Sequence, residues 1–498
     1  MGDAPRQVDV VVVGAGNAGL CAAIAAREAG ASVLLLERGA PATRGGNSWY
    51  TAGAMRVAYR DVDDLVSVYE PLSDDEIDRT DFGAYPEQAF YDDLARITEY
   101  RCDPELASTL VGGSLGTLQW MRGHGVRFLP SYGRQSFEVD GRRKFWGGLA
   151  VEVAGGGPGL VDALFARATH LGVDIVYQAR AAGLHEDRGS IDGLTYRRDG
   201  STVAVQTKSV VLAAGGFEAN GEWRTRYLGP GWDLAKVRGT RFNTGDGIRM
   251  ALELGAMPWG QWSGCHAVAW DRNAPDFGDP AVGDGFQKHS YPLGIIVNAE
   301  GRRFVDEGAD FRNYTYAKYG RAILGQPGQV AWQVFDAKVT DLLRDEYRIK
   351  QCTRVRADTL DELAAKMEGI DARQFLAEIE TFNLAVQDGR PFNPALRDGR
   401  ATAGLPIAKS NWANPLDVPP YEAYQVTCGI TFTFGGLKVD AGARVIDTED
   451  VAIPGLFAAG ELVGGLFYFN YPGGSGLTSG SVFGRIAGSG AAAHAMPA

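Results

Sequence analysis

Cysteine is scarce in this sequence, and its spacing excludes several classes of protein. The 498 residues include five cysteines, which are odd in number, widely spaced and without a Cys-x-x-Cys pair. That pattern predicts neither a disulfide scaffold nor a zinc knuckle, and the lack of Cys-x-x-Cys-His excludes attached c-type haem. An iron–sulfur centre needs a cysteine cluster, which is also missing. We expect no bound metal.

Positive charge is the second deficit. Lysine and arginine number 49 against 61 aspartates and glutamates, which leaves a formal net charge of −12. A surface of this sign disfavours nucleic acids and anionic membranes as partners. It does not exclude an anionic small-molecule substrate, because a few arginines in one cleft decide the local potential.

Long hydrophobic runs are absent as well. The most apolar stretch, residues 10–26, is too short to span a membrane and is interrupted by Gly14, Gly16, Asn17 and Gly19. It has no basic start and no export signal. We therefore expect no membrane span and a cytoplasmic location.

Glycine, in contrast, is abundant. The chain has 67 glycines, nearly twice the average usage of about 7%. With 45% hydrophobic residues, 22% charged residues and 22 prolines, the composition is that of a globular protein. The length predicts two to four domains of about 150 residues each. The glycines must therefore serve local purposes.

The N-terminal segment has the pattern strand, helix, strand. Residues 8–13 form a β-branched run, residues 17–29 an Ala-rich helical stretch and residues 32–37 a second apolar run. The motif Gly14-Ala15-Gly16-Asn17-Ala18-Gly19 lies at the first strand-to-helix junction, and Glu37 ends the second strand. This context predicts a dinucleotide-binding fingerprint.

Each fingerprint residue has a physical role. Gly14 allows the tight turn, Gly16 lets the backbone approach a pyrophosphate, and Gly19 lets helix and strand pack closely. The helix N-terminus offers free N–H groups to phosphates. Glu37 accepts hydrogen bonds from ribose hydroxyls.

Further segments extend this pattern. The dense glycines of residues 45–53 predict backbone lying against a flat ligand. Residues 61–93 are strongly acidic and predict a solvated helical excursion. Strands are expected at 173–177, joining the nucleotide-binding sheet, and at 209–214. Thr244-Gly245-Asp246-Gly247 opens a predicted helix.

The composition changes near Trp262 and returns to the opening pattern after about Tyr424. We therefore expect three regions, with residues 1–261 and 427–498 forming one domain and residues 262–426 inserted as another. In the tail, a predicted strand at 455–461 ends in Gly460-Glu461, and a helix of small residues runs to about His494.

Taken together, these motifs resemble the FAD-dependent flavoproteins of the fumarate reductase and succinate dehydrogenase family. The resemblance implies an α/β fold with a bipartite, Rossmann-like FAD-binding domain and an inserted α+β capping domain. Within the family the likeness is greatest to tricarballylate dehydrogenase, on residues 215–220, 238–245 and 429–434. The segments that match the wider family are Gly14 to Gly19 with Glu37, Gly45-Gly46-Asn47-Ser48, Ala213-Ala214-Gly215-Gly216, Thr244-Gly245-Asp246-Gly247, Arg303-Phe304-Val305-Asp306-Glu307 and Ala458-Ala459-Gly460-Glu461.

The resemblance also implies which residues hold FAD. Covalent members attach the flavin to a histidine near the segment where this chain has Ser48 and Trp49, so we expect non-covalent FAD. The predicted cofactor-binding residues are Gly14, Gly16, Asn17, Ala18, Gly19, Glu37, Arg38, Gly45, Gly46, Asn47, Ser48, Ala52, Gly53, Ala182, Ala214, Gly215, Thr244, Asp246, Gly460, Glu461, Ser475, Gly476 and Leu477.

Flavin N5 takes a hydride from a substrate carbon whose neighbour carries a C–H bond made acidic by a carboxylate or ketone. Loss of the hydride and of the acidic proton makes a C=C bond, and the reverse reaction removes it. The helix beginning near Gly476 directs its positive end to the reduced flavin, with backbone N–H groups of Ser475 and Leu477 as donors. The family's substrate histidine aligns with His266. The family's proton-transferring arginine aligns with Phe311 of this chain. A shift of the alignment by one residue makes Arg312 the candidate proton shuttle or carboxylate clamp.

Two departures argue against fumarate reduction itself. This chain has Thr431-Phe432 where fumarate reductases have two histidines, and Tyr471 where they have a clamping arginine. The segment from Tyr471 to Ser475 is similar to the Tyr-Pro-Gly-x-Gly stretch of 3-ketosteroid Δ1-dehydrogenases, whose tyrosine and a backbone N–H polarise a ketone. Tyr314 and Tyr316 are the candidate bases in that chemistry. Packing beside the flavin is the structural alternative for Tyr471.

The main hypothesis is an FAD-dependent dehydrogenase or ene-reductase acting next to a carboxylate or carbonyl, as in tricarballylate dehydrogenase. A ketone dehydrogenase and a flavin-carrying subunit of an electron-transfer complex are the alternatives. The second dinucleotide fingerprint of a pyridine-nucleotide reductase is missing. We therefore expect a separate electron acceptor besides the carboxylate or ketone substrate.

Overall fold

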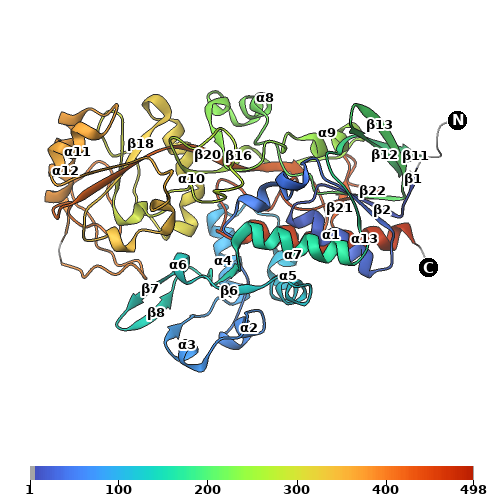
Figure 1. Ribbon diagram of the computed structural model, residues 1–498, viewed down its shortest axis with the longest axis horizontal. Coiled ribbons are helices and arrows are strands. Elements are labelled where there is room, and N and C mark those ends of the chain that lie inside the picture. Colours follow the sequence, from blue (N-terminus) through green and yellow to red (C-terminus); the bar gives the residue numbers. More distant parts are fainter. Residues whose placement is uncertain (1–5, 388, 497–498) are drawn as a thin grey trace.

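The structure is a computed structural model that describes residues 6–387 and 389–496. A six-stranded sheet in the order β10-β3-β2-β14-β22-β21 forms the right-hand end of the molecule in Figure 1. The predicted strands at 173–177 and 209–214 join this sheet, as β10 and β14. The bounds are β2 Val10–Val13, β3 Val33–Leu36, β10 Asp174–Val176, β14 Ser209–Leu212, β21 Arg444–Ile446 and β22 Ala452–Ala458.

The register of the parallel strands brings four chain segments to one edge. Val13 pairs with Leu36 and with Leu212, and Leu212 pairs with Ala458, so these four residues end their strands side by side. The loops that follow therefore open at the same edge of the sheet. Ligands of open α/β sheets bind at this carboxyl edge.

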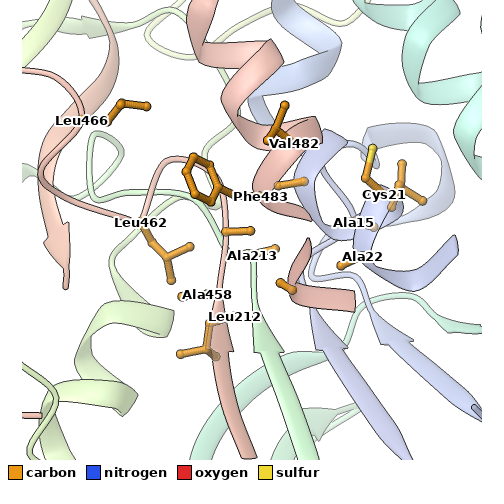
Figure 2. Packing of buried hydrophobic residues seen from close by; sticks show 14 of the residues in the cluster. Ala15, Cys21, Ala22, Leu212, Ala213, Ala458, Leu462, Leu466, Val482 and Phe483 are labelled. Carbon is orange, nitrogen blue, oxygen red and sulfur yellow. The ribbon is translucent and has the colours of Figure 1, made fainter. Parts of the chain in front are cut away.

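The first and last long helices pack against each other on this sheet. Figure 2 shows α13 (Ser475–Ala495), with Val482 and Phe483, beside α1 (Asn17–Glu28), which carries Cys21 and Ala22. A Cβ atom at Gly488 would lie 2.1 Å from the carbonyl oxygen of Ala22. The contact is this close because glycine lets the two backbones approach. It joins the two ends of the chain into one domain.

An antiparallel sheet, β1-β13-β12-β11, lies beside the first sheet, and small sheets β4-β9-β6 and β5-β8-β7 flank the helical part. The acidic segment 61–93 contains the short helices α2 and α3 and the start of α4, joined by loops and strand β5. Helices α2 and α3 lie at the lower side of Figure 1. The bounds are β1 Arg6–Gln7, β4 Ala54–Met55, β5 Thr80–Asp81, β6 Phe128–Pro130, β7 Ser136–Val139, β8 Arg142–Phe145, β9 Val151–Val153, β11 Arg180–Asp187, β12 Ser190–Arg198 and β13 Ser201–Gln206, with helices α2 Val62–Val66, α3 Asp74–Asp78, α4 Glu87–Ile97, α5 Pro104–Gly123, α6 Tyr132–Gln135, α7 Gly156–His170, α8 Gly221–Trp223 and α9 Asp246–Glu253.

The capping domain occupies the left-hand end of Figure 1 and is built on a second large sheet. Its longest strands, β16 (Pro258–Asp271) and β20 (Tyr421–Leu437), pair antiparallel and continue into the FAD-binding region. The boundaries expected at 261/262 and 426/427 fall inside these two strands, so a continuous β-ribbon connects the domains. The other elements are β15 Lys236–Val237, β17 Ile295–Asn298, β18 Ala331–Phe335, β19 Arg354–Ala357, α10 Tyr316–Leu324, α11 Leu360–Lys366 and α12 Ala372–Ala385.

Two structural absences apply to residues 6–387 and 389–496. No helix there is long and apolar enough to cross a membrane. No group of three or more His, Cys, Asp or Glu side chains in the same ranges is placed to hold a metal ion.

The contact between α1 and α13 makes a testable prediction. We expect Gly488→Ala to lower the free energy of unfolding by about 1–3 kcal/mol, because the added methyl group must push the helices apart. Chemical denaturation measures this change. Gly116→Ala, on α5 where nothing lies within 4 Å of the added Cβ, is the control and should stabilise the protein by about 0.5–1 kcal/mol. Equal effects of the two substitutions would contradict the packing argument.

Candidate active site

One large cavity runs from the carboxyl edge of the parallel sheet into the capping domain. Its walls come from both chain ends and from the middle of the chain. The predicted site residues that line it are Gly14, Gly16, Asn17, Ala18, Glu37, Arg38, Gly46, Asn47, Ser48, Ala52, Ala214, Gly215, Asp246, Gly460, Glu461, Gly476, Leu477, His266, Arg312, Tyr316 and Tyr471.

The fingerprint glycines differ in their surroundings. A Cβ at Gly14, where φ is +100°, would lie 2.4 Å from Ala213 O, and one at Gly19 would lie 1.8 Å from Gly14 O. Both positions therefore need glycine for internal packing. A Cβ at Gly16 meets nothing closer than Ser48 Oγ at 3.5 Å. Gly16 thus presents bare backbone to the cavity at the start of α1, where phosphate groups are favoured.

Glu37 and Arg38 follow β3 at the same edge. Glu37 is buried and accepts a 2.5 Å hydrogen bond from Gly39 N, and burial raises the pKa of its carboxyl group. Arg38 Nη1 donates to Thr244 Oγ1 at 2.7 Å and pairs with Asp246 at 2.9 Å. Arg38 and Asp246 therefore form one wall of the cavity, and Thr244 supports them from behind.

A buried polar network lies in the middle of the cavity. Asn47 Nδ2 donates to Glu218 Oε1 at 2.7 Å and to Thr431 O at 2.6 Å. Asn243 Nδ2 donates to Glu218 at 2.7 Å and to Glu461 at 3.2 Å. Burial raises the pKa of both carboxyl groups, and Glu461 raises that of Glu218 further. Both carboxyl groups therefore favour the neutral form more strongly than a solvent-exposed glutamate does.

Glu218 and Asn243 belong to the motif segments but not to the predicted site residues. The signal that finds them is their place in the sequence: Glu218 follows Gly216 by two residues, and Asn243 directly precedes Thr244-Gly245. Some predicted residues support the cavity without lining it. Gly45 faces Val161, Gly53 faces Gly156, and the Ala182 carbonyl accepts a 3.0 Å hydrogen bond from Arg249.

The C-terminal helix directs its N-terminus into the cavity. Helix α13 begins at Ser475, and Gly476 and Leu477 line the cavity. Ser475 itself does not, and its N–H donates to Pro472 O at 3.1 Å. The positive end of the helix dipole is thus aimed at any ligand held there, while the Ser475 N–H is already engaged.

Two tyrosines from distant parts of the chain meet in the capping half of the cavity. Tyr316 begins α10, Tyr471 lies just before α13, and their hydroxyl groups are hydrogen bonded to each other. The His266 ring centroid lies 4.9 Å from each tyrosine ring and 5.1 Å from Phe432. All four side chains line the cavity.

The surroundings of the two hydroxyl groups differ. Burial raises the pKa of both tyrosines. For Tyr316 the hydrogen bond from Tyr471 and the positive charges of Arg238 and Arg312 oppose that rise, whereas for Tyr471 its neighbour Tyr316 adds to it. Both pKa values thus stay above the ordinary value for tyrosine, and either hydroxyl group can be the donor in the contact between them.

His266 has two buried ring nitrogens without hydrogen-bond partners in the part of the chain that the structure describes. Burial, then the charge of Arg238, holds its pKa well below the usual range, so the ring is neutral. A neutral imidazole that lines a cavity with both nitrogens unpaired has hydrogen-bonding capacity left for a ligand.

Tyr314, the other candidate base, does not reach this site. Its hydroxyl contacts Asp93 and Gly147 O, at 2.5 and 2.9 Å, and the residue is not part of the cavity wall. The reason is the 3-10 turn Arg312–Tyr314, which precedes α10 and turns Tyr314 away from Tyr316.

Arg312 lines the cavity together with Arg134, Arg238 and Arg344, none of which is among the predicted site residues. Arg238 is paired with Asp284 by hydrogen bonds of 2.9 and 2.5 Å and also donates to Thr431 Oγ1 at 3.1 Å. Burial lowers the pKa of the Arg312 guanidinium well below its ordinary value, and Arg344 lowers it further.

With this geometry in hand, the chain can be compared with known proteins. Residues 9–477 match the family model described as FAD binding domain. The chain is 30% identical over 492 residues to the fumarate reductase (cytochrome) of Shewanella frigidimarina, covering 98% of this chain and 77% of the relative. It is 28% identical over 545 residues to 4-oxocyclohexanecarboxylate 2-dehydrogenase of Sinomonas cyclohexanicum, covering 96% and 91%.

Solved structures give the same result. The open conformation of a flavocytochrome c3 fumarate reductase has a TM-score of 0.73 at 27% identity and covers 99% of this chain and 79% of that one. The 3-ketosteroid Δ1-dehydrogenase from Sterolibacterium denitrificans has a TM-score of 0.72 at 22% identity, covering 98% and 100%, which shows a shared fold. The resemblance to the fumarate reductase flavoproteins, the structural likeness to ketosteroid dehydrogenases and the fold class are thereby confirmed.

The residues present fit FAD. Bare backbone at Gly16, the α1 and α13 N-termini and the buried Glu37 lie along one cavity. A dinucleotide with a polar, flat ring system matches these donors and acceptors.

Gly16 allows a test of cofactor binding apart from folding. We expect Gly16→Val to raise the Kd for FAD at least tenfold, about 1.4 kcal/mol, because its side chain would occupy space open only to the ligand. Flavin fluorescence on titration measures the Kd, and thermal unfolding of the apo-protein should not change. A variant that binds FAD like the original protein would contradict the assignment of this wall.

Proposed function

Because this chain belongs to the FAD-binding domain family, together with the fumarate reductase flavoproteins, we propose that it interconverts a CH–CH bond and a C=C bond next to a ketone. The coarser description, an FAD-dependent oxidoreductase acting on CH–CH or C=C bonds, follows from the family. The observation that carries the ketone assignment is the hydroxyl contact between Tyr316 and Tyr471 inside the cavity.

A clamping arginine suits a carboxylate, whereas a neutral phenol suits a ketone. Tyr471 is buried and keeps its proton, so it donates a hydrogen bond to the carbonyl oxygen on which negative charge develops. Its position before α13 places this donor beside the helix N-terminus. Ser475 N–H would have to leave Pro472 O to act as a second donor.

Tyr316 takes the proton from the carbon next to the ketone. Its ionised form is favoured by the hydrogen bond from Tyr471 and by the charges of Arg238 and Arg312. Bound FAD supplies the hydride acceptor at N5. For each double bond formed, the substrate loses one proton to Tyr316 and one hydride, and a separate electron carrier takes up the two electrons. Hydrogenation is the reverse.

We propose that the FAD is held without a covalent bond. Where covalent members have a histidine, Ser48 Oγ accepts a 2.9 Å hydrogen bond from Asn17 N, and Trp49 Nε1 donates to Pro280 O at 3.2 Å. Neither group forms the histidine–flavin link. Release of yellow FAD from acid-denatured protein into the supernatant tests this assignment.

The polycarboxylate hypothesis, as in tricarballylate dehydrogenase, has one supporting observation. Arg312 lines the cavity without an ion pair among the described residues. A guanidinium is hard to deprotonate and clamps carboxylates well. In that hypothesis Arg312→Ala abolishes turnover of a polycarboxylate and Tyr471→Phe does not.

The tyrosine pair gives the central prediction. We expect Tyr471→Phe to reduce kcat for a cyclic ketone by about 10²- to 10³-fold and Tyr316→Phe by about 10²- to 10⁴-fold. Anaerobic bleaching of the flavin and dye-linked turnover measure the effect. FAD content should remain unchanged because neither hydroxyl group lies at the nucleotide edge.

Tyr319→Phe is the matched control. Tyr319 lies on the same helix as Tyr316, is buried, and donates to Asp306 O outside the cavity wall. It should retain turnover. Full activity of Tyr471→Phe together with loss of activity in Arg312→Ala would reject the ketone assignment in favour of the polycarboxylate.

Ionisation of Tyr316 gives a pH prediction. Because burial places the pKa of Tyr316 above its ordinary value of 10.0, the base form grows as pH rises. We expect kcat/KM for dehydrogenation to increase about tenfold per pH unit on the alkaline side of neutrality. A stopped-flow pH profile measures this slope, and Tyr316→Phe should flatten it. A profile that falls with rising pH would contradict the assignment of Tyr316 as base.

A further inference from the structure

Four side chains form the shared wall of two cavities. Arg134, His289, Arg312 and Arg344 line the main cavity and also a second, smaller pocket beside it. None of them except Arg312 belongs to the residues that the sequence motifs predict. The four residues come from four separate segments of the chain, and the fold brings them together on one wall.

These side chains have unused hydrogen-bonding capacity. Arg312 Nε, Arg344 Nε and Nη1, and His289 Nε2 are buried without hydrogen-bond partners in the described part of the chain. Arg312 Nη2 donates to Arg134 O at 2.8 Å. Arg344 Nε and Glu346 Oε1 form an ion pair at 2.8 Å, but their relative orientation does not have the geometry of a hydrogen bond. Buried donors without partners are costly unless a ligand satisfies them.

The charges around this wall do not balance. Asp284 pairs with Arg238 and, at 3.4 Å, with Arg134, and Glu346 pairs with Arg344. Glu152 adds negative charge near Arg134 but accepts a hydrogen bond from Ser131. Four guanidinium groups thus share three carboxylates, and Arg312 is left without one.

His289 connects this wall to the tyrosine pair. Its ring centroid lies 4.8 Å from that of Tyr316. Burial, then Arg312 and Arg344, lowers the pKa of His289 well below the usual range, so it adds no positive charge. The polarity of the cavity therefore changes from neutral hydroxyl groups at Tyr471 and Tyr316 to uncompensated positive charge at Arg312.

We infer that Arg312 and Arg344, with His289, form a subsite for a carboxylate of the substrate, so that the substrate class is a keto acid. This inference rests on the proposed function, because Tyr471 assigns the ketone. Guanidinium groups bind carboxylates through paired, charge-assisted hydrogen bonds. The carbon skeleton between the two polar groups would lie in the main cavity, where Phe432 and Phe467 provide apolar walls beside Tyr471.

The experiment compares 4-oxocyclohexanecarboxylate with its methyl ester, which keeps the ketone and removes the charge. We expect the holoenzyme to prefer the acid in kcat/KM, and Arg344→Gln to reduce the acid-to-ester ratio at least about tenfold, the effect of losing one charge-assisted hydrogen bond. Equilibrium binding of the acid, followed through the visible spectrum of the flavin, should weaken by a similar factor.

Two further variants control for folding and for net charge. Arg344→Gln combined with Glu346→Gln removes the ion pair without leaving a buried carboxylate alone, and it should show the same loss of preference. Arg348→Gln changes the same charge at an exposed position on the neighbouring turn and should keep the original ratio.

The outcomes separate this inference from the proposed function. Turnover of acid and ester at equal kcat/KM, or an unchanged ratio in both Arg344 variants, would overturn the keto-acid subsite while leaving the ketone chemistry in place. The proposed function itself would be overturned by a different result. In that case the acid, the ester and neutral cyclic ketones would all fail to bleach the flavin, while tricarballylate or succinate would bleach it.

Discussion

The parallel alignment of four strand ends is the constraint on which the rest of this structure depends. Strands β3, β2, β14 and β22 stop in register at Leu36, Val13, Leu212 and Ala458. The cofactor wall consists of the residues that follow these ends, so it exists only when the first and last parts of the chain are paired. The contact of α13 on α1 holds that pairing, because glycine lets the two helices touch through backbone atoms.

A second constraint is the burial of polar groups along the cavity. At the nucleotide half, Arg38 pairs with Asp246, and the amides of Asn47 and Asn243 satisfy one oxygen of Glu218. In the capping half several donors remain without partners, among them both nitrogens of His266. Protein interiors rarely leave such groups unpaired. The unpaired groups of the capping half that line the cavity are therefore ones that a ligand can satisfy.

Much of the nucleotide half follows from the sequence. The spacing of Gly14, Gly16 and Gly19 between two apolar runs predicts a strand, a turn and a helix, because those conformations depend on local backbone freedom and periodicity. The strand at 209–214 and the terminal helix are also predicted, with ends that shift by one or two residues. Glu218 and Asn243 lie inside recognised motifs, yet their contact with Glu461 depends on residues more than two hundred positions away.

The capping half is less predictable, and the tyrosines show why. Tyr314 and Tyr316 are equivalent candidates in the sequence, separated by one residue, but a 3-10 turn before α10 directs them to different partners. The sequence by itself determined the cofactor class, because phosphate and flat-ring binding use local glycine motifs. Only the tertiary structure decided that Tyr316 meets Tyr471, and that Arg134, Arg312 and Arg344 share one wall. Contacts between distant segments depend on how the domains pack, which no local pattern encodes.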